Sequence, residues 1–554
     1  MVAGTVYGAF RRSVERFRDR CFLCVLGETA RHYGIEARTY TYGEANEAVQ
    51  ALAERYRQSG LQQGQRVGLM LENRPAMFFH WLALNRLGVS VVPLNSDWRE
   101  AELEYVIGHS ELAVAVVPAT RQRDVGSAAV RAGREVAVGR DSLDNLGIVS
   151  RSPTARGCAS DPDQNTECAL LYTSGTTGRP KGCVLTNEYF LWAGTWYAGV
   201  GGLCKLAEGS ERLLTPLPMA HMNAMAFSTM AMLLTGGCII PLDRFHPSTW
   251  WASVALAGAT VVHYLGVMPA MLLGAEPSPG DRSHAVKFGF GAGVSLRLHQ
   301  PFESRFGFPL LEAWAMTETG AGAAVIAGHE PRKVGTACFG KPSALVEYRI
   351  VGESGADVAP GEHGELWVRS AAGSPRFGFF REYLKDPQAT ANAWQGGYFH
   401  TGDMVFADQQ GDLHFVDRKK NVIRRSGENI SAIEVEGVLL QHPRIAGVGV
   451  AAVPDEVRGD EVMACVIPRG ELSDAERLQL ARELVSFCLE RLAYFKAPGF
   501  VAFCDRLPLT ATAKIQRAGL GELARKSLGA ARTVDLRGMK KRTAVAADDV
   551  GAPR

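Results

Sequence analysis

Residues 172–182 read Tyr172-Thr173-Ser174-Gly175-Thr176-Thr177-Gly178-Arg179-Pro180-Lys181-Gly182 and follow the apolar run Ala169-Leu170-Leu171. Such an apolar run is typical of a buried strand. In the stretch after it, glycines let the backbone approach a ligand closely, and hydroxyls and cations can surround an anion. The stretch therefore predicts a phosphate-binding loop after a strand, although clusters of glycine, serine and threonine also form plain surface loops.

This loop differs from the Walker A motif, in which the second glycine is followed directly by lysine and then by serine or threonine. Here Pro180 stands where that second glycine would fall, and Gly182 follows Lys181. The sequence therefore indicates a phosphate loop of another kind.

The composition is that of an ordinary globular enzyme. The chain has 554 residues, of which 46% are hydrophobic and 21% charged, and this length predicts about three or four core units. Its 60 basic and 58 acidic residues leave a net charge of +2, so nothing suggests bulk nucleic-acid binding.

Cysteine usage and hydropathy indicate a reduced, cytoplasmic protein. Of the 11 cysteines only Cys21 and Cys24 have C-x-x-C spacing, and no second pair or histidine cluster accompanies them, which favours free thiols over a zinc or redox site. Residues 1–10 lack the apolar core of a secretory signal. The most apolar segment, 224–240, contains polar residues and a Gly-Gly pair, so we expect a buried helix, a turn and a strand rather than a membrane span.

Helix and strand patterns alternate along much of the chain, which predicts parallel sheets covered by helices. In the first part we expect helices at 42–58 and 76–87 and strands at 66–71, 90–94 and 112–117. The alternation resumes over 210–326.

Two later regions have a different character. Residues 344–405 hold short strands between Gly, Pro and Asp turns, which suggests a small antiparallel or barrel-like unit. Beyond residue 421 a compact α+β unit follows, with helices expected at 431–442 and 474–492 and a strand at 445–453. Residues 532–554 mix basic residues, Ala and Asp without periodicity, so we expect them to be disordered and dispensable.

The order of residues in 172–182 resembles the signature loop of the adenylate-forming superfamily, which contains acyl-CoA synthetases, peptide-synthetase adenylation domains and luciferases. The resemblance covers most of the chain, because later motifs arrive in the family's order. It implies an α/β fold whose large N-terminal domain of parallel sheets covered by helices carries a small β-barrel-like unit, followed by a small, mobile α+β C-terminal domain. We expect these domains at 1–417 and 418–530, and a disordered tail at 531–554.

For ATP, the resemblance implies a phosphate cradle and a magnesium site. The cradle would consist of Thr173, Ser174, Gly175, Thr176, Thr177, Gly178 and Lys181. Glu318 would hold Mg²⁺, a hard cation suited to carboxylates, and Thr317 beside it would donate to a phosphate. The alternative is that the segment Thr317-Glu318-Thr319 caps a helix, because residues of these types are common at helix starts. The family motif reads Tyr-Gly-x-Thr-Glu, but here Trp314 and Ala315 replace its first two residues, so an aromatic face for adenine remains while the tyrosine hydroxyl is lost.

Further candidate residues would bind the adenine and ribose groups of ATP. The family's glycine-rich adenine segment matches Gly291, Ala292 and Gly293, although a plain glycine turn would look the same. Asp403, in a Thr-Gly-Asp motif, can accept from both ribose hydroxyls, with a turn aspartate as the alternative. Arg418 would be a second ribose contact, although the charge run around it resembles a solvated face.

The remaining candidates concern chemistry and domain motion. Lys514 would bridge the carboxylate and the α-phosphate as charge builds. Gly427 would line the thiol tunnel, and the small domain would rotate about a hinge at Lys420. His221 would border the acyl pocket as a substrate-binding residue. For each of the two lysines the alternative is a solvated surface charge, and for the histidine it is a structural role.

The sequence thus predicts an ATP- and Mg²⁺-dependent acyl-CoA ligase with a small carboxylic acid, ATP and CoA as partners. Segments such as 216–224 and 427–436 look most like crotonobetaine/carnitine-type and short- to medium-chain ligases of fatty acid metabolism. The rivals are a free-standing adenylation enzyme that loads a carrier protein, and a non-catalytic nucleotide sensor, which the retained charged residues disfavour. The oligomeric state stays open, with a dimer as one option.

Overall fold

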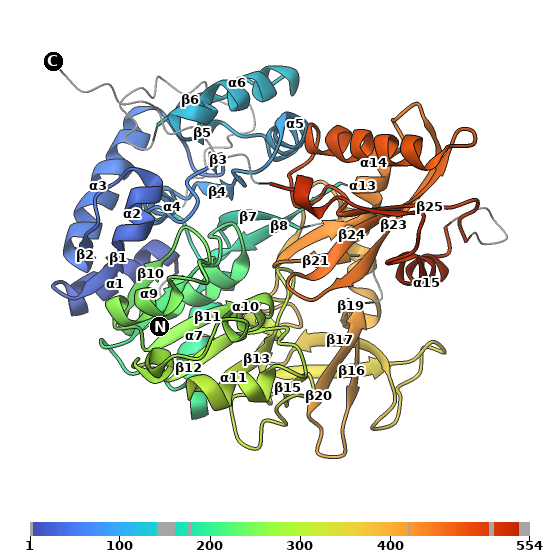
Figure 1. Ribbon diagram of the computed structural model, residues 1–554. Coiled ribbons are helices and arrows are strands. Elements are labelled where there is room, and N and C mark those ends of the chain that lie inside the picture. Colours follow the sequence, from blue (N-terminus) through green and yellow to red (C-terminus); the bar gives the residue numbers. More distant parts are fainter. Residues whose placement is uncertain (1–3, 141–160, 174–178, 419–421, 509–514, 542–554) are drawn as a thin grey trace.

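The computed structural model describes residues 4–140, 161–173, 179–418, 422–508 and 515–541 (Figure 1). The predicted α/β fold is confirmed: a large N-terminal part with two mixed sheets and an antiparallel half-barrel precedes a smaller α+β unit. Within the described residues, no helix combines enough length and apolar character to cross a bilayer.

The first sheet has a parallel centre and antiparallel edges, in the order β14-β13-β12-β11-β9-β10-β1-β2. Its strands are β1 (Cys21–Cys24), β2 (Thr39–Thr41), β9 (Arg212–Thr215), β10 (Cys238–Pro241), β11 (Val261–Leu265), β12 (Phe288–Ala292), β13 (Leu310–Trp314) and β14 (Val325–Ile326).

The second sheet has the order β18-β8-β7-β4-β3-β5-β6 and ends in the antiparallel pairs β7·β8 and β8·β18. Its strands are β3 (Arg66–Leu69), β4 (Ser90–Pro93), β5 (Val114–Val116), β6 (Ala137–Gly139), β7 (Glu167–Thr173), β8 (Lys181–Thr186) and β18 (Glu382–Tyr383).

Helices cover both faces of both sheets. Neighbouring strand residues such as Leu213 and Leu214, or Val91 and Val92, belong to different apolar clusters, because successive side chains of a strand point to opposite faces. Between the sheets lie α1 (Val6–Phe17), α3 (Tyr42–Gln58), α4 (Pro75–Arg86), α7 (Asn187–Gly199) and α8 (Thr229–Thr235). Outside the first sheet lie α9 (Trp250–Ala257), α10 (Val267–Leu273) and α11 (His299–Phe306), and outside the second lie α5 (Glu100–Ser110) and α6 (Gln122–Arg131).

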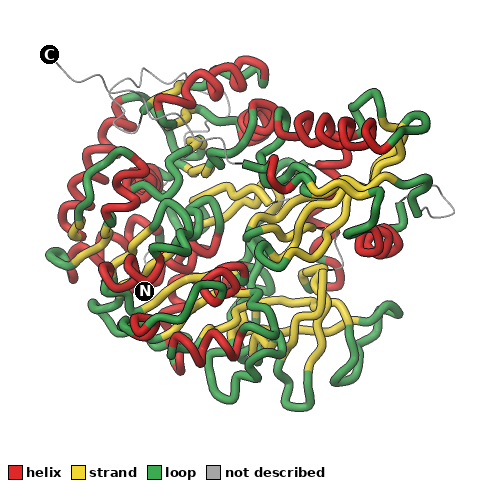
Figure 2. The backbone as a smooth tube through the Cα atoms, in the orientation of Figure 1, coloured by secondary structure: helices red, strands yellow, loops and turns green. Residues whose placement is uncertain are grey.

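The small unit predicted within 344–405 is an antiparallel half-barrel that also takes in β15 and β20 (Figure 2, lower right). Its strands are β15 (Cys338–Gly340), β16 (Val346–Val351), β17 (Gly364–Ser370), β19 (Phe399–Ala407) and β20 (Leu413–Arg418). Of the short helices, α2 (Gly27–Tyr33) lies between β1 and β2 in the sequence, and α12 (Pro387–Ala393) lies between β18 and β19.

The C-terminal unit packs helices on two faces of a mostly antiparallel sheet. Its strands are β21 (Val422–Arg425), β22 (Glu428–Ser431), β23 (Ile445–Asp455), β24 (Gly459–Pro468), β25 (Phe500–Phe503) and β26 (Thr533–Asp535). Helices α13 (Ala432–Leu439) and α14 (Asp474–Leu489) cover one face, and α15 (Arg517–Ser527) covers the other. The sheet begins after β20 ends at Arg418, and residues 419–421 between them lie outside the described residues.

Several expected elements match closely because their signals are local. Helix α3 spans Tyr42–Gln58 as expected, since Thr41 and Glu44 form a capping box at its start. Segment 224–240 is indeed buried and contains a helix, a turn and β10, but it begins with a π-helical turn, η3 (Asn223–Ser228). Such wide turns often occur at functional sites.

The disorder expected for 532–541 is wrong. Strand β26 pairs with β25, Leu536 is buried in the C-terminal core, and Val534 and Met539 pack against it. The fully buried Lys540 donates to Glu461, which also accepts from Arg425 at 2.8 Å. The sequence did not show this because the strand is too short for periodicity and its ionic partners lie far away in the chain.

Truncation after residue 531 should destabilise the C-terminal unit, whereas truncation after Lys541 should not. The first change removes β26, uncovers core residues and takes Lys540 from the buried Glu461, and breaking a buried ion pair costs about 3–5 kcal/mol. The second change keeps every described contact of 532–541. Calorimetric unfolding of both truncated chains measures the difference, and equal melting temperatures would contradict a stabilising role.

Candidate active site

A cavity of about 220 Å³ lies where both N-terminal sheets, the half-barrel and the C-terminal unit meet. It collects candidates that are widely separated in the sequence. The lining includes Thr173, Lys181, His221, Gly291, Ala292, Trp314, Thr317, Glu318, Asp403 and Gly427.

The other site residues predicted from the sequence either do not line this cavity or lie outside the described residues. Gly293 does not line the cavity. Arg418 ends β20 with its backbone paired to that of Asp403, which brings the two ribose candidates to adjacent strands. Ser174, Gly175, Thr176, Thr177, Gly178, Lys420 and Lys514 lie outside the described residues.

The signature loop connects the two strands of a hairpin, β7 and β8. Thr173 and Lys181 are cross-strand partners at its open end, and both line the cavity. Lys181 Nζ lies 4.8 Å from the ring centre of Tyr383 and 3.9 Å from Asp386 Oδ2. Both ends of the loop are therefore anchored at the cavity, with a lysine ammonium directed along its wall.

Glu318 has the surroundings of a carboxylate that could hold a hard cation. Its side chain lines the cavity, the residue is 8% exposed, and Oε1 accepts from the Tyr383 hydroxyl at 2.9 Å. No group of three or more acidic, His or Cys side chains arranged for a metal occurs among the described residues. One carboxylate still fits Mg²⁺, which is often held by one or two carboxylates together with substrate phosphates.

The glycine-rich adenine segment is shaped by close contacts. A Cβ on Gly291 would lie 2.3 Å from the Tyr264 carbonyl oxygen, so only glycine fits there. Gly293 has φ +82° and donates to Glu312 Oε2 at 2.8 Å, while Val294 donates to Oε1 at 3.1 Å. The role of Gly293 here is thus to hold the segment.

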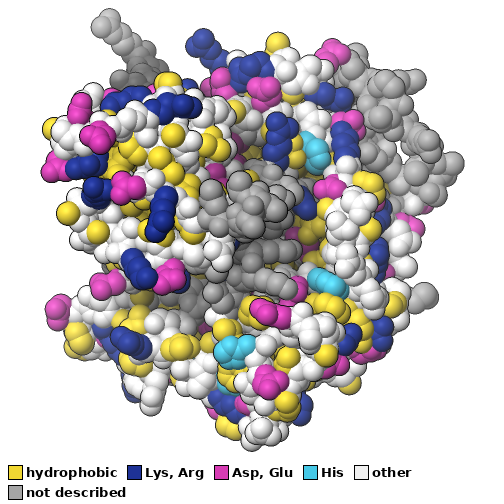
Figure 3. All heavy atoms as spheres, turned by 90° about the vertical axis from the view of Figure 1, so that its right-hand side faces the viewer, with side chains coloured by type: hydrophobic (Ala, Val, Ile, Leu, Met, Phe, Trp, Pro, Cys, Tyr) yellow, Lys and Arg dark blue, Asp and Glu magenta, His cyan; other side chains and the backbone are white. Residues whose placement is uncertain are grey.

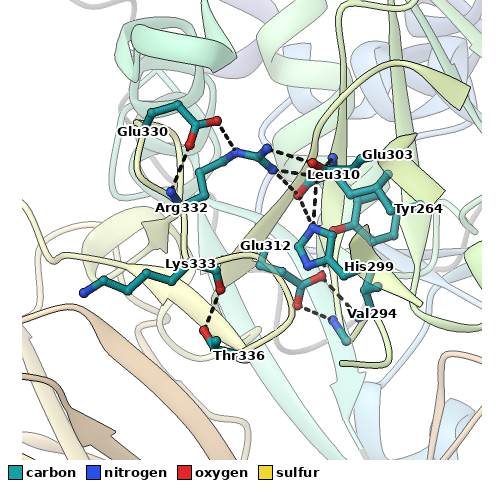
Figure 4. Close-up of polar contacts among 11 residues, drawn as sticks. Tyr264, Val294, His299, Glu303, Leu310, Glu312, Glu330, Arg332, Lys333 and Thr336 are labelled. Atoms are coloured by element: carbon teal, nitrogen blue, oxygen red, sulfur yellow. Dashed lines mark hydrogen bonds and ion pairs between the residues drawn. The ribbon is translucent and has the colours of Figure 1, made fainter. Parts of the chain in front are cut away.

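Glu312 belongs to a polar network behind the cavity wall (Figure 4). It also accepts from the Tyr264 hydroxyl at 2.8 Å, and burial raises the pKa of its carboxyl group. Nearby, Arg332 makes a two-bond ion pair with Glu303 at 2.6 and 2.8 Å, and Glu303 accepts from the Leu310 amide at 2.8 Å. These bonds fix the start of β13 and the end of β12.

Trp314, which departs from the family pattern, has a defined polar role. Its indole Nε1 donates to Asp403 Oδ2 at 2.9 Å, and Asp403 is only 1% exposed. The indole also stacks with Phe339 at a centroid distance of 6.1 Å. The lost tyrosine hydroxyl is therefore replaced by an N–H that joins the adenine and ribose candidates.

The C-terminal unit reaches into the cavity through Gly427 and its neighbours. Gly427 has φ +89°, and a Cβ there would lie 2.2 Å from Leu265 Cδ1. Beside it, Glu428 Oε2 lies 3.6 Å from His221 Nε2. Burial alone would lower the pKa of His221, but the Glu428 carboxylate outweighs it, and the pKa is raised.

A buried ion triad joins the two parts of the chain. Lys496 Nζ donates to Glu102 of α5 at 2.5 Å and to Glu434 of α13 at 2.9 Å. Burial opposes a charged lysine, but the two carboxylates outweigh it and raise the pKa of Lys496. Trp98 packs beside this contact against the C-terminal core.

Sequence reasoning missed Tyr383, Glu312 and the triad of Glu102, Glu434 and Lys496. None stands in a recognisable local motif, and each is defined by partners from other elements. Charges of both signs are mixed over the face of the molecule that carries the C-terminal unit (Figure 3), and the described cysteines are all free thiols.

Known proteins share this architecture. A family model described as AMP-binding enzyme matches residues 10–384, and one described as AMP-binding enzyme C-terminal domain matches residues 434–514. The crotonobetaine/carnitine–CoA ligase of Citrobacter koseri is 30% identical over 495 residues, 87% of this chain and 93% of that protein.

Two solved structures of one enzyme, the o-succinylbenzoate CoA synthetase of Bacillus subtilis, are also similar. A double mutant bound to a product analogue gives a TM-score of 0.77 at 25% identity and covers 93% of this chain and 98% of that one. The complex with the acyl-adenylate intermediate gives 0.62, also at 25% identity, with coverages of 92% and 97%. The chain therefore belongs to the AMP-binding enzyme family, among its AMP-forming acid–CoA ligases.

Proposed function

We propose that this enzyme converts a small carboxylic acid to its CoA thioester in two half-reactions at one cavity. The carboxylate oxygen attacks the α-phosphorus of ATP, which gives an acyl-adenylate and pyrophosphate. The CoA thiolate sulfur then attacks the acyl carbon, which releases AMP. The observation that carries the proposal is the convergence of Lys181, Glu318, Asp403 and Gly427 on this cavity.

In this proposal each group has one task. Thr173, Lys181 and residues 174–178 hold the ATP phosphates, with Thr317 as an additional donor. Trp314, Gly291 and Ala292 enclose adenine, and Asp403 and Arg418 hold ribose. Glu318 would hold Mg²⁺, which neutralises phosphate charge when bound. Lys514 would stabilise charge that builds at the α-phosphate.

We further propose that the described arrangement serves the thioester step. Gly427 lines the cavity, and Glu428 faces His221 across the two units. The product-analogue complex of the Bacillus enzyme also fits this chain better than the adenylate complex of the same enzyme, at equal identity. The proposed units are residues 1–417 and 418–541, with a hinge at Lys420, so the second unit is longer than the sequence suggested.

The similarity to crotonobetaine/carnitine–CoA ligases supports a short- to medium-chain acid as substrate and CoA rather than a carrier protein as acceptor. His221 would then stand between the acyl group and the incoming thiol. A carboxylate needs no deprotonation at neutral pH, so no general base is required in the first step.

With ATP and an accepted acid, the enzyme should release pyrophosphate, and with CoA present it should also release AMP and form a thioester. Chelating Mg²⁺ should abolish adenylation, and with it thioester formation from ATP, because the triphosphate loses its counter-charge. Pyrophosphate release over carboxylic acids of graded length, with and without CoA, measures this. Formation of ADP and phosphate would contradict the proposal, and transfer only to a carrier protein would support the rival acceptor.

Lys496→Met should slow the thioester step at least about tenfold relative to adenylation. It leaves Glu102 and Glu434 as two buried carboxylates without their cation, which favours separation of the two units. The matched control is Lys526→Met, since Lys526 is exposed and its one ion pair within the described part of the chain is with Glu522 of its own helix. Pyrophosphate exchange and thioester formation from supplied acyl-adenylate are assayed separately, and equal losses in both steps would contradict the role of the triad.

A further inference from the structure

A hydrogen-bonded group of four side chains lies along one wall of the cavity and has no role in the proposed reaction steps. This group, here called the relay, consists of Tyr197, Asn223, Ser228 and His263. His263 Nδ1 lies 2.7 Å from Asn223 Oδ1 and 2.9 Å from Ser228 Oγ, and its Nε2 lies 3.0 Å from the Tyr197 hydroxyl. The relay joins α7, η3 and β11, and of its members only Asn223 lines the cavity.

The position of the Asn223 amide oxygen determines the direction of the hydrogen bonds in this relay. The amide oxygen of Asn223 can only accept, so the 2.7 Å contact places the proton on His263 Nδ1. His263 Nε2 then accepts from the Tyr197 hydroxyl. The Ser228 hydroxyl donates to the backbone carbonyl oxygen of Asn223 at 3.2 Å. His263 is fully buried, and burial lowers its pKa to about 3, so it stays neutral.

This arrangement leaves the amide nitrogen of Asn223 as a donor on the cavity wall. With Oδ1 held by His263, Nδ2 is directed away from the relay, and it has no hydrogen-bond partner among the residues that the structure describes. The π-helical turn of η3 holds this geometry, because Ser228 and Thr229 bind the carbonyl oxygens of Asn223 and Ala224.

The cavity lining contributed by η3, α7 and β12 and the residues just before η3 is mostly apolar and aromatic, with His221 and Asn223 as polar members. Trp196, Phe227, Phe290 and Ala324 line the cavity, and Phe290 stacks on His263 at 4.7 Å. The charged and hydroxyl groups proposed for the nucleotide instead come from β7, β8, β19, β20 and the loop after β13, whereas the proposed adenine wall shares β12 with Phe290. A single neutral donor on an apolar wall suits an uncharged acceptor, since a fixed charge would be costly to bury there.

We propose that the Asn223 carboxamide, oriented by His263, donates to an uncharged oxygen on the acyl chain. This inference rests on the proposed function and narrows its substrate class to acids with a hydroxyl, keto or ether oxygen. Asn223 is the specificity residue that touches the substrate, and His263 is a positioning residue. A site built around a donor discriminates against analogues that leave the donor unpaired.

The test compares shape-matched acids that carry either an oxygen group or a methyl group at successive chain positions, such as 3-hydroxybutanoate and 3-methylbutanoate. The wild-type enzyme should favour one oxygenated acid over its methyl partner by at least about tenfold in kcat/KM for pyrophosphate release. Asn223→Leu should remove or reverse this ratio. His263→Leu should weaken it, and His263→Asn, which restores a donor near the position of Nδ1, should rescue it.

Thr235→Ala is the matched control, because it removes a hydroxyl that binds the Ala231 carbonyl oxygen of its own helix α8 without touching His263 or η3, and it should leave the ratio unchanged. Equal use of both acids of every pair by the wild-type enzyme would overturn the inference while the proposed function stands. Pyrophosphate release with no acid at all would instead refute the proposed function. A preference for hydroxy acids not shared by the matching keto acids would overturn the assignment of Asn223 as donor.

Discussion

The position of the C-terminal unit depends on one buried cation, Lys496. An ammonium group removed from water needs counter-charges nearby, and these come from both parts of the chain, Glu102 and Glu434. Glu434 lies in the first turn of α13, directly after β22, so fixing this carboxylate also fixes the turn at Gly427. An ion triad outside the cavity thereby helps to determine which C-terminal backbone lines the cavity.

The same unit carries a second buried charge cluster of Arg425, Glu461 and Lys540 beside that turn. Burial and the neighbouring Arg425 lower the pKa of Lys540 to about 7, even though Glu461 accepts from it. Since Arg425 directly precedes the turn that leads to Gly427, segment 532–541 supports the cavity through this cluster. The end of β21 at Arg425 and the start of α13 after β22 are thus held by ionic contacts in addition to apolar packing.

Which features the sequence could predict depends on how far apart in the chain the interacting residues lie. The capping box of α3 and the apolar run in β7 depend on neighbours within a few residues, so their signals are local. The Lys496–Glu102 bond joins residues 394 positions apart, and the relay from Asn223 to His263 joins residues 40 positions apart. No local pattern marks either pair, and Lys540 in particular looks like an ordinary surface lysine until Glu461 is placed beside it.

Trp314 shows how a departure from the family pattern can be compensated within the site. An indole is larger than a phenol, and its one donor points to Asp403, so the adenine wall and the proposed ribose acceptor are joined directly. A carboxylate that is 1% exposed would otherwise be costly to keep charged, and a donated hydrogen bond offsets part of that cost. Trp314 therefore supplies a polar donor at this position while its indole shapes the cavity on the proposed adenine side, and the proposed acyl side has a separate donor in Asn223.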